Sequence, residues 1–337
     1  MRTPFLIAAA LLFGAAPSLS FQAVKPPPKL VGAKSAPEPL FQNVEVIGAS
    51  ISAGFGLTLS SAPKPAPAGK ETPAVDGAPP PKTKLDLATV IEASLVGEHG
   101  ALVDKADELT FMHARGSAKS AAKSLADKKP TLVVALDYLF WFGYGSNWGS
   151  DQGRLDGLEI GLKSLEGVDC PILLGDFADM SMALKSPKPM LPPDALPTSA
   201  TLEKLNARVA EWAGAHKNVI LVANSRLVHA LNAGDEIKIG ADVWPKGSDA
   251  ALLQEDRLHT TLEGTVALWL NALARLREAK PELRAESFEL SAAALLERID
   301  PGAKPHTRLA VVSPAKSGGT GLSGGAGKAG GTGKKGP

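Results

Sequence analysis

The sequence predicts an α/β fold in which a five-stranded parallel sheet carries helices on both faces, in three layers. Two observations lead to this prediction. Several short runs are almost continuously apolar, which is typical of strands buried on both faces, and segments with helical periodicity separate most of them. In addition, 44% of the 337 residues are hydrophobic, which suffices for the core of one α/β domain of ordinary size.

The predicted strands and helices alternate along the chain. The strands are expected at residues 44–47, 109–114, 131–137, 171–176 and 219–223. The helices are expected at residues 85–98, 117–128, 155–165, 201–216 and 260–279. Strands separated by helices require parallel crossover connections, so the expected architecture is flavodoxin-like.

The chain divides by composition into a domain and several flanking or inserted segments. Residues 1–20 begin with a basic residue, continue with a short apolar run and end in small residues, as secretory signal peptides do. The domain is expected at residues 41–312. Pro- and Ala-rich composition predicts a linker at 21–40 and a surface insertion at 61–84, and Gly- and Lys-rich composition predicts a disordered tail at 313–337.

The predicted signal peptide favours a bacterial protein that is periplasmic or secreted. Cys170 is the only cysteine, so an internal disulfide is excluded. The apolar run at residues 4–16 is short for a membrane span, and no transmembrane segment is expected after cleavage. The 36 basic and 35 acidic residues nearly balance, which gives no indication of a nucleic acid partner.

Residues 44–56 combine a buried strand, a break at Gly48 and a serine, Ser50, directly after the strand. Open α/β sheets place their chemistry at this edge. Backbone N–H groups after the strand favour negative charge there, which suits a nucleophile whose attack creates an oxyanion. A tight turn without function is the alternative. A phosphate loop is less suitable because the Gly-Lys-Ser/Thr ending is absent.

Asp256 and His259 form a second motif near the other end of the domain. Two such residues three apart on a turn can lie side by side, so that the carboxylate accepts from one ring nitrogen while the other faces Ser50. Thr260 and Glu263 match a capping box, which predicts that a helix begins directly after the histidine. For His259 alone, a surface or capping role is the alternative.

Three segments resemble motifs of the SGNH, or GDSL-type, hydrolase family. Residues 48–56 resemble the first block of the family, and Asp256-x-x-His259 followed by Gly264 resembles the last block. Residues 115–117, Arg-Gly-Ser, are similar to its glycine block. The order and spacing of these blocks cover most of the predicted domain.

The resemblance implies a flavodoxin-like SGNH hydrolase fold and hydrolysis of esters without a metal or other cofactor. By position, it makes Ser50 the nucleophile, His259 the base, Asp256 the residue that orients the base, and Gly116 an oxyanion donor beside the N–H of Ser50. The expected substrate is a small-molecule, lipid or carbohydrate ester.

The sequence departs from the family pattern at two positions. Ala49 stands where the family usually has an aspartate, and the asparagine of the third block is missing after the third strand. Asp137 is the candidate for the oxyanion hole at that place, although an ionised carboxylate cannot donate a hydrogen bond. Protonation of Asp137, or another donor such as Asn147, would supply the missing hydrogen bond to the oxyanion. If Asp137 stays charged in the site, exchanging it for asparagine is expected to raise activity.

Aromatic residues follow the third predicted strand. Tyr138, Phe140 and Trp141 are candidates for substrate binding, as an acyl-binding or sugar-stacking surface, and a hydrophobic plug under a loop is the alternative.

Together, the signal peptide and the residues Ser50, Asp256 and His259 predict an exported serine esterase. The competing hypothesis is a weakly active or inactive relative that binds a glycan or lipid in the cell envelope.

Overall fold

The structure is a computed structural model that describes residues 38–59 and 85–309. The predicted signal peptide, the linker up to residue 37, the insertion at 61–84 and the tail at 313–337 lie outside the described residues. The described residues belong to the unit Gly32–Ala310.

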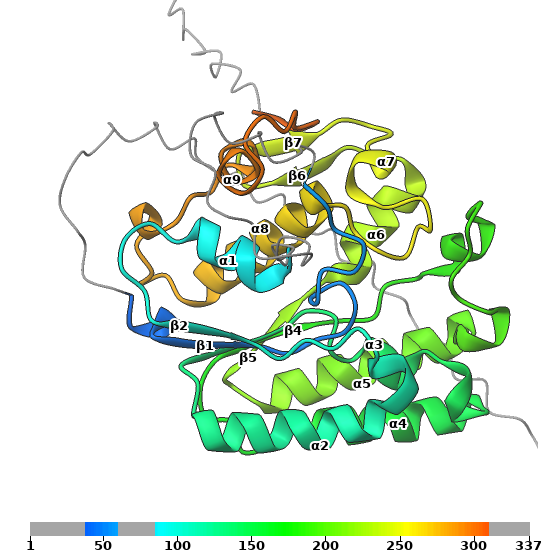
Figure 1. Ribbon diagram of the computed structural model, residues 1–337. Helices are drawn as coiled ribbons and strands as arrows, with labels where there is room; N and C mark the ends of the chain where they lie inside the picture. The colour runs from blue at the N-terminus through cyan, green and yellow to red at the C-terminus, as the bar shows by residue number, and fades with distance from the viewer. Residues whose placement is uncertain (1–37, 60–84, 310–337) are drawn as a thin grey trace, which may run out of the picture. The chain divides into compact units, whose positions relative to one another are not determined.

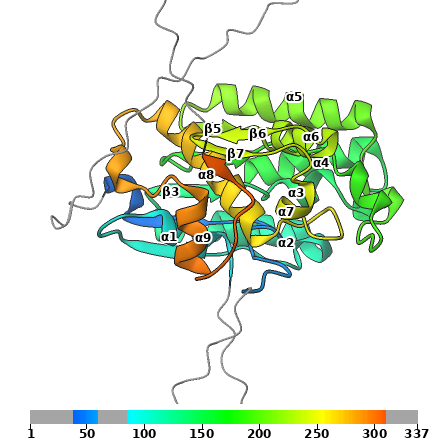
Figure 2. The same cartoon turned by 90° about the horizontal axis from the view of Figure 1, so that it is seen from above.

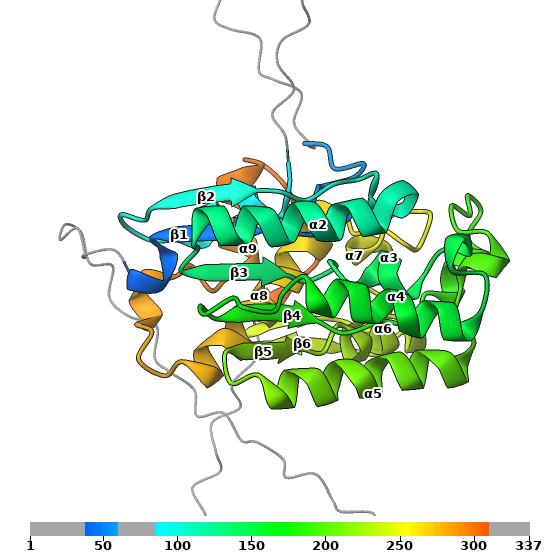
Figure 3. The same cartoon turned by 90° about the horizontal axis from the view of Figure 1, so that it is seen from below.

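The central sheet has five parallel strands in the order β2-β1-β3-β4-β5, as Figure 3 shows. The strands are β1 (Asn43–Val46), β2 (Ala101–Asp104), β3 (Leu132–Ala135), β4 (Ile172–Gly175) and β5 (Val219–Val222). This order is the flavodoxin-like one, in which the sequential order of the strands reverses at a switch point between β1 and β3. The predicted fold class is confirmed.

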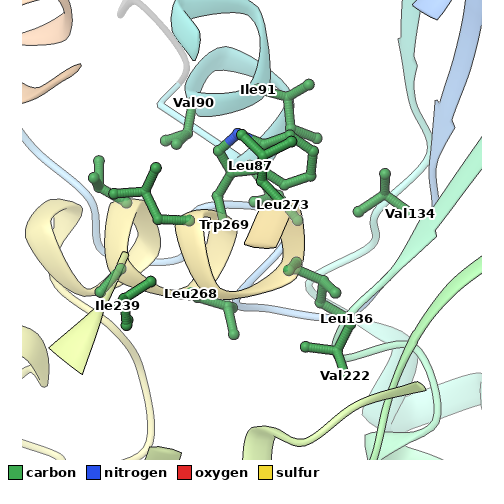
Figure 4. Close-up of a cluster of buried hydrophobic side chains, with 14 of the residues drawn as sticks. Leu87, Val90, Ile91, Val134, Leu136, Val222, Ile239, Leu268, Trp269 and Leu273 are labelled. Carbon is green, nitrogen blue, oxygen red and sulfur yellow. The ribbon is translucent and has the colours of Figure 1, made fainter. Parts of the chain in front are cut away.

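Helices cover both faces of the sheet (Figure 1). One face carries α2 (Thr110–Lys128), α4 (Asp151–Lys163) and α5 (Ser199–Ala215), and the other carries α1 (Leu87–Ser94), α8 (Leu262–Ala279) and α9 (Ala292–Ile299). Each face therefore has its own apolar core. In Figure 4, Trp269 of α8 lies among Leu87, Ile91 and Leu273, and its Nε1 donates to Oγ of Ser94 at 2.8 Å. Among the described helices, none has the length and apolar character that a membrane crossing needs.

A small antiparallel sheet lies on the side of α8 and α9 (Figure 2). Its strands are β6 (Ile237–Ile239), β7 (Asp242–Trp244) and β8 (Arg308–Leu309). The remaining helices are α3 (Phe140–Gly143), α6 (Asn224–Ala233) and α7 (Asp249–Leu252), with short 3-10 turns at Pro39–Phe41, Ser146–Trp148, Ser181–Lys185, Pro193–Ala195 and Ala285–Ser287. The sequence did not predict the small sheet, because strands of two or three residues are too short to show a periodic pattern. It did not predict α9 either.

The second strand was predicted at the wrong place. It is β2, whereas Leu109 is the N-cap of α2 and residues 110–114 form the start of that helix. The apolar residues that suggested a strand are exposed: Leu109 by 52%, Phe111 by 45% and Met112 by 64%. Apolar character at these positions therefore does not reflect burial in the sheet, and the segment has no strand neighbour among the described residues.

The capping box was also misplaced by one residue. Thr261, not Thr260, caps α8, and its hydroxyl accepts from the N–H of Gly264 at 3.0 Å. Glu263 instead accepts from Nε1 of Trp244 at 2.9 Å and from the N–H of His306 at 2.9 Å. Glu263 thus ties the segment before β8 to the start of α8.

Candidate active site

The turn that carries Ser50 leaves the sheet at the C-terminal end of β1. Gly48 begins it, and a Cβ atom at this residue would lie 2.4 Å from Oδ1 of Asp137 and 2.4 Å from Oγ of Ser52. Only glycine fits this close approach without a shift of its neighbours. The N–H of Phe55 donates to the carbonyl of Ser50 at 2.9 Å, which closes the turn below the serine.

The structure brings Ser50, His259 and Asp256 together in one hydrogen-bonded line. Nε2 of His259 lies 3.0 Å from Oγ of Ser50, and Nδ1 of the same ring lies 2.7 Å from Oδ2 of Asp256. Ser50 and His259 are 209 residues apart in the sequence. All three side chains are buried. The geometry places a base within reach of a hydroxyl and a carboxylate behind the base.

The Asp256 carboxylate is fixed by its own turn. Its Oδ1 accepts from the N–H of Leu258 at 2.9 Å and from the N–H of His259 at 3.0 Å, while Oδ2 faces the His259 ring. Burial alone would raise the pKa of Asp256, but these hydrogen bonds hold that pKa below its usual range. The carboxylate is therefore ionised at neutral pH and can hold an N–H on Nδ1, which leaves Nε2 free to accept a proton.

Gln254 joins the two segments that carry the serine and the histidine. Its Nε2 donates to the carbonyl of Phe55 at 2.7 Å and to the carbonyl of Thr260 at 2.8 Å. The ring of Phe55 packs against that of His259, with centroids 4.4 Å apart. The sequence analysis missed both residues, because a glutamine or phenylalanine in a turn carries no pattern that indicates a bridge.

Asp137 accepts hydrogen bonds from the turn that carries Ser50, here called the nucleophile turn, and does not act as an oxyanion donor. Its carboxylate accepts from the N–H groups of Ala49 at 3.0 Å, Ile51 at 2.9 Å and Ser52 at 3.1 Å, and lies 2.5 Å from the hydroxyl of Ser52. Burial raises the pKa of Asp137, and the hydrogen bonds that it accepts oppose this shift. Both carboxylate oxygens are thus occupied by the turn, which corrects the placement expected from the sequence.

The other expected oxyanion donors are not where the sequence placed them. Gly116 lies inside α2 rather than at the end of a strand, and Asn147 donates through Nδ2 to the carbonyl of Phe111 at 3.2 Å. Neither lines the pocket of Ser50. The backbone N–H of Ser50 has no acceptor among the residues that the structure describes.

A largely apolar pocket opens beside Ser50, at the C-terminal edge of β3 and β4. Much of its wall consists of large apolar side chains: Leu139, Phe140, Phe177, Met180, Val228 and Leu258. Ser50 is itself one of the residues that line this pocket.

The aromatic residues after β3 fall in three different places. Phe140 lines the pocket of Ser50, whereas Trp141 lines a separate pocket. Tyr138 is buried, and its hydroxyl lies 2.5 Å from Oγ of Ser164. Burial raises the pKa of Tyr138 to about 12. Of the three predicted substrate-binding residues, the structure therefore places only Phe140 beside Ser50.

In the described part of the chain, no cluster of three or more His, Cys, Asp or Glu side chains is arranged to hold a metal ion.

Comparisons with known proteins concern the fold. No family model matches the sequence, and no curated protein matches it. The crystal structure of TesA is similar to this chain, with 17% identity, a TM-score of 0.38, and coverage of 71% of this chain and 99% of that one. The lipase/acylhydrolase from Enterococcus faecalis is similar as well, with 16% identity, a TM-score of 0.39, and coverage of 74% and 99%.

Proposed function

We propose that this chain is a serine hydrolase that cleaves carboxylic esters through an acyl-enzyme on Ser50. The observation that carries the proposal is the line from Asp256 through His259 to the hydroxyl of Ser50, with separations of 2.7 Å and 3.0 Å. Such a line activates a hydroxyl that is otherwise a weak nucleophile.

The chemistry follows from this geometry. Oγ of Ser50 attacks the ester carbonyl while Nε2 of His259 accepts the hydroxyl proton, and the carbonyl electron pair moves to the oxygen. The N–H of Ser50 stabilises this oxyanion. The intermediate collapses, the C–O bond to the alcohol breaks, and the histidine returns the proton to the departing oxygen. A water molecule, deprotonated by the same nitrogen, then attacks the acyl group and releases the acid from Ser50. Asp256 stabilises the imidazolium in both steps.

The pocket beside Ser50 favours esters with an apolar acyl group. Leu139, Phe177 and Met180 lie in its wall, and transfer of each buried CH₂ of a substrate from water contributes about 0.8 kcal/mol. We therefore place the acyl part of the ester in this pocket, with the carbonyl carbon at Ser50.

A binding protein with little turnover is the second candidate function. It is favoured by the places of Gly116, Asp137 and Asn147, none of which offers a donor to an oxyanion at Ser50. Loss of one oxyanion donor typically costs about 2.7–4 kcal/mol, or about 10²–10³ in rate. A protein of this kind would hold the acyl group without rapid release of acid.

Labelling by a fluorophosphonate probe distinguishes the two functions. The hydrolase is expected to react in the wild type and in Ser181→Ala, a control on an exposed serine, and to lose labelling in Ser50→Ala and His259→Ala. Hydrolysis of p-nitrophenyl butyrate is likewise expected in the wild type and in Ser181→Ala, and is expected to be lost in Ser50→Ala and His259→Ala. Equal rates in wild type and Ser50→Ala would exclude the acyl-enzyme, and binding of the ester without labelling would favour the binding protein.

We also propose that the protein acts outside the cytoplasm, on the basis of residues 1–20. The test is the mass of the protein recovered from a bacterial host and from its periplasm. Removal of a segment of about this length in the periplasmic fraction is expected, and an intact chain found only in the cytoplasm would contradict export.

A further inference from the structure

A second pocket lies between the start of α2 on one side and α3 with the residues that follow it on the other. Its walls include Phe111, Arg115, Trp141, Tyr144, Asn147 and Trp148. It differs in kind from the pocket of Ser50, because aromatic rings alternate here with a cationic and an amide side chain. None of these residues takes part in the proposed hydrolysis.

Phe111 and Trp141 are neighbouring rings in the wall of this second pocket. The ring centroids of Phe111 and Trp141 are 5.7 Å apart, and Phe111 is 45% exposed. The guanidinium of Arg115 lies over the ring of Trp148, with its carbon 5.0 Å from the centroid. At this distance the ring attracts the cation and favours its place at the pocket wall.

The polar groups of the pocket have unused hydrogen-bonding capacity. Arg115 is exposed, and no carboxylate within the described ranges forms an ion pair with it. Asn147 uses Nδ2 for the carbonyl of Phe111, and no donor to its Oδ1 is found among the described residues. A guanidinium that lies over an indole ring and has no acidic partner among the described residues is suited to a carboxylate ligand, because it binds carboxylates bidentately.

The second pocket is a neighbour of the Ser50 pocket. Phe140 lines the Ser50 pocket, and its ring stacks on Tyr144 at 4.3 Å and meets Trp141 edge-on at 4.9 Å. Tyr144 and Trp141 both line the second pocket. One aromatic side chain therefore belongs to the wall of the first pocket and contacts the wall of the second.

We propose that the second pocket binds a saccharide whose rings carry carboxylate groups. The C–H faces of a sugar ring pack on exposed aromatic rings such as Phe111, its hydroxyl groups suit the amide of Asn147, and its carboxylate pairs with Arg115. A purely apolar chain would leave the cation and the amide without partners, which burial under a ligand makes costly. The inference stands on this pocket and does not depend on hydrolysis at Ser50.

Titration calorimetry on the full chain tests the proposal. The probes are a trisaccharide of uronic acids and the same trisaccharide with its carboxyl groups reduced to hydroxymethyl groups. The acidic sugar is expected to bind about ten-fold more tightly than the reduced one, because a hydrogen bond between two charged groups is stronger than a hydrogen bond from the guanidinium to a neutral hydroxyl. Arg115→Gln is expected to remove this preference, and Phe111→Ala to weaken both sugars. Lys119→Gln, an exposed exchange on the same helix, is the control and is expected to change neither.

Several results would overturn the proposal: no binding of either sugar, equal binding of both by the wild type, or binding that Arg115→Gln and Phe111→Ala leave unchanged. Tighter binding of a mononucleotide than of the acidic trisaccharide would assign the pocket to another ligand class. Hydrolysis of p-nitrophenyl butyrate is measured on the same variants and is expected to be unchanged. Failure of sugar binding with intact hydrolysis rejects only this inference, and sugar binding without hydrolysis rejects only the proposed enzyme.

Discussion

The hydroxyl of Ser52 and the carboxylate of Asp137 lie 2.5 Å apart beneath the nucleophile turn, although 85 residues separate them in the sequence. The contact belongs to a set in which Asp137 also accepts from the N–H groups of Ala49, Ile51 and Ser52. The turn that presents Ser50 is therefore fastened to the end of β3 by one carboxylate. A shift of this turn would leave buried N–H groups without an acceptor, which is costly.

Asp137→Asn is expected to reduce activity and stability. An amide offers one acceptor oxygen and turns an NH₂ group toward N–H donors of the turn, so at least one hydrogen bond is replaced by repulsion. The free energy of unfolding is expected to fall by about 1–3 kcal/mol. The rate of ester hydrolysis is expected to fall about 10–100-fold, because a small displacement of the nucleophile from its reactive geometry lowers the rate strongly.

Urea unfolding and p-nitrophenyl butyrate hydrolysis measure the two effects of Asp137→Asn. Asp169→Asn, on an exposed aspartate, is the control and is expected to match the wild type. A rise in rate for Asp137→Asn would show that the carboxylate opposes the oxyanion, as the sequence alone suggests, and that the turn does not need it.

Gly48→Ala and Gly214→Ala are expected to have opposite effects. A Cβ atom at residue 48 would lie 2.4 Å from both Oδ1 of Asp137 and Oγ of Ser52, so overpacking is expected to cost about 1–3 kcal/mol and to displace Ser50. Gly214 lies in α5 with no atom within 4 Å of its would-be Cβ, and alanine there is expected to stabilise the helix by about 0.5–1 kcal/mol. Thermal unfolding checks both, and equal melting temperatures for the two variants would contradict the packing argument.

The sheet and the approach of Ser50 to His259 follow from local sequence patterns. Strand ends in a parallel sheet meet at one edge, and a turn before a helix returns a side chain to that edge. Both segments also carry the small and polar residues that such turns need. For this reason the sequence predicted the five-stranded parallel sheet. It also predicted that Ser50 and His259, which lie 3.0 Å apart in the structure, would meet.

The support of the site could not be predicted in the same way. The role of Asp137 depends on how far β3 extends beside β1, where Val46 pairs with Val134, and apolar patterns do not fix the register of an all-apolar strand. The place of Gly116 was missed because exposed apolar residues imitate a strand at the start of α2. The bridge made by Gln254 joins two turns, and a turn has no periodicity that reports its contacts.

Gln254→Leu is expected to lower kcat for small esters while leaving KM nearly unchanged. The variant removes the two hydrogen bonds from Nε2 that hold the carbonyls of Phe55 and Thr260, so the serine and histidine segments are free to separate. A fall of about ten-fold in kcat is expected from the loss of orientation. Steady-state hydrolysis of p-nitrophenyl acetate provides the measurement.

Gln152→Leu, on an exposed face of α4, is the control for this exchange and is expected to retain the wild-type kcat. Gln254→Glu is a second variant of similar shape that cannot donate, and it is expected to behave as Gln254→Leu does. Wild-type kcat in Gln254→Glu would show that shape alone positions the two segments.

Asp256→Asn is expected to destabilise the protein at neutral pH and to make little difference in acid. The pKa of Asp256 is lowered by its hydrogen bonds in the folded state, so its contribution to stability is present above the ordinary carboxyl pKa of about 3.9 and is lost as the pH falls through the folded value. Urea unfolding at pH 7 is expected to show a deficit of about 1.5–3 kcal/mol for the variant, the range for hydrogen bonds to charged groups. The deficit is expected to shrink steadily below pH 4, whereas Asp169→Asn is expected to show none at either pH. A deficit that stays constant between pH 7 and pH 3 would mean that the carboxylate charge does not stabilise the His259 turn, and the orienting role of Asp256 would then have to be abandoned.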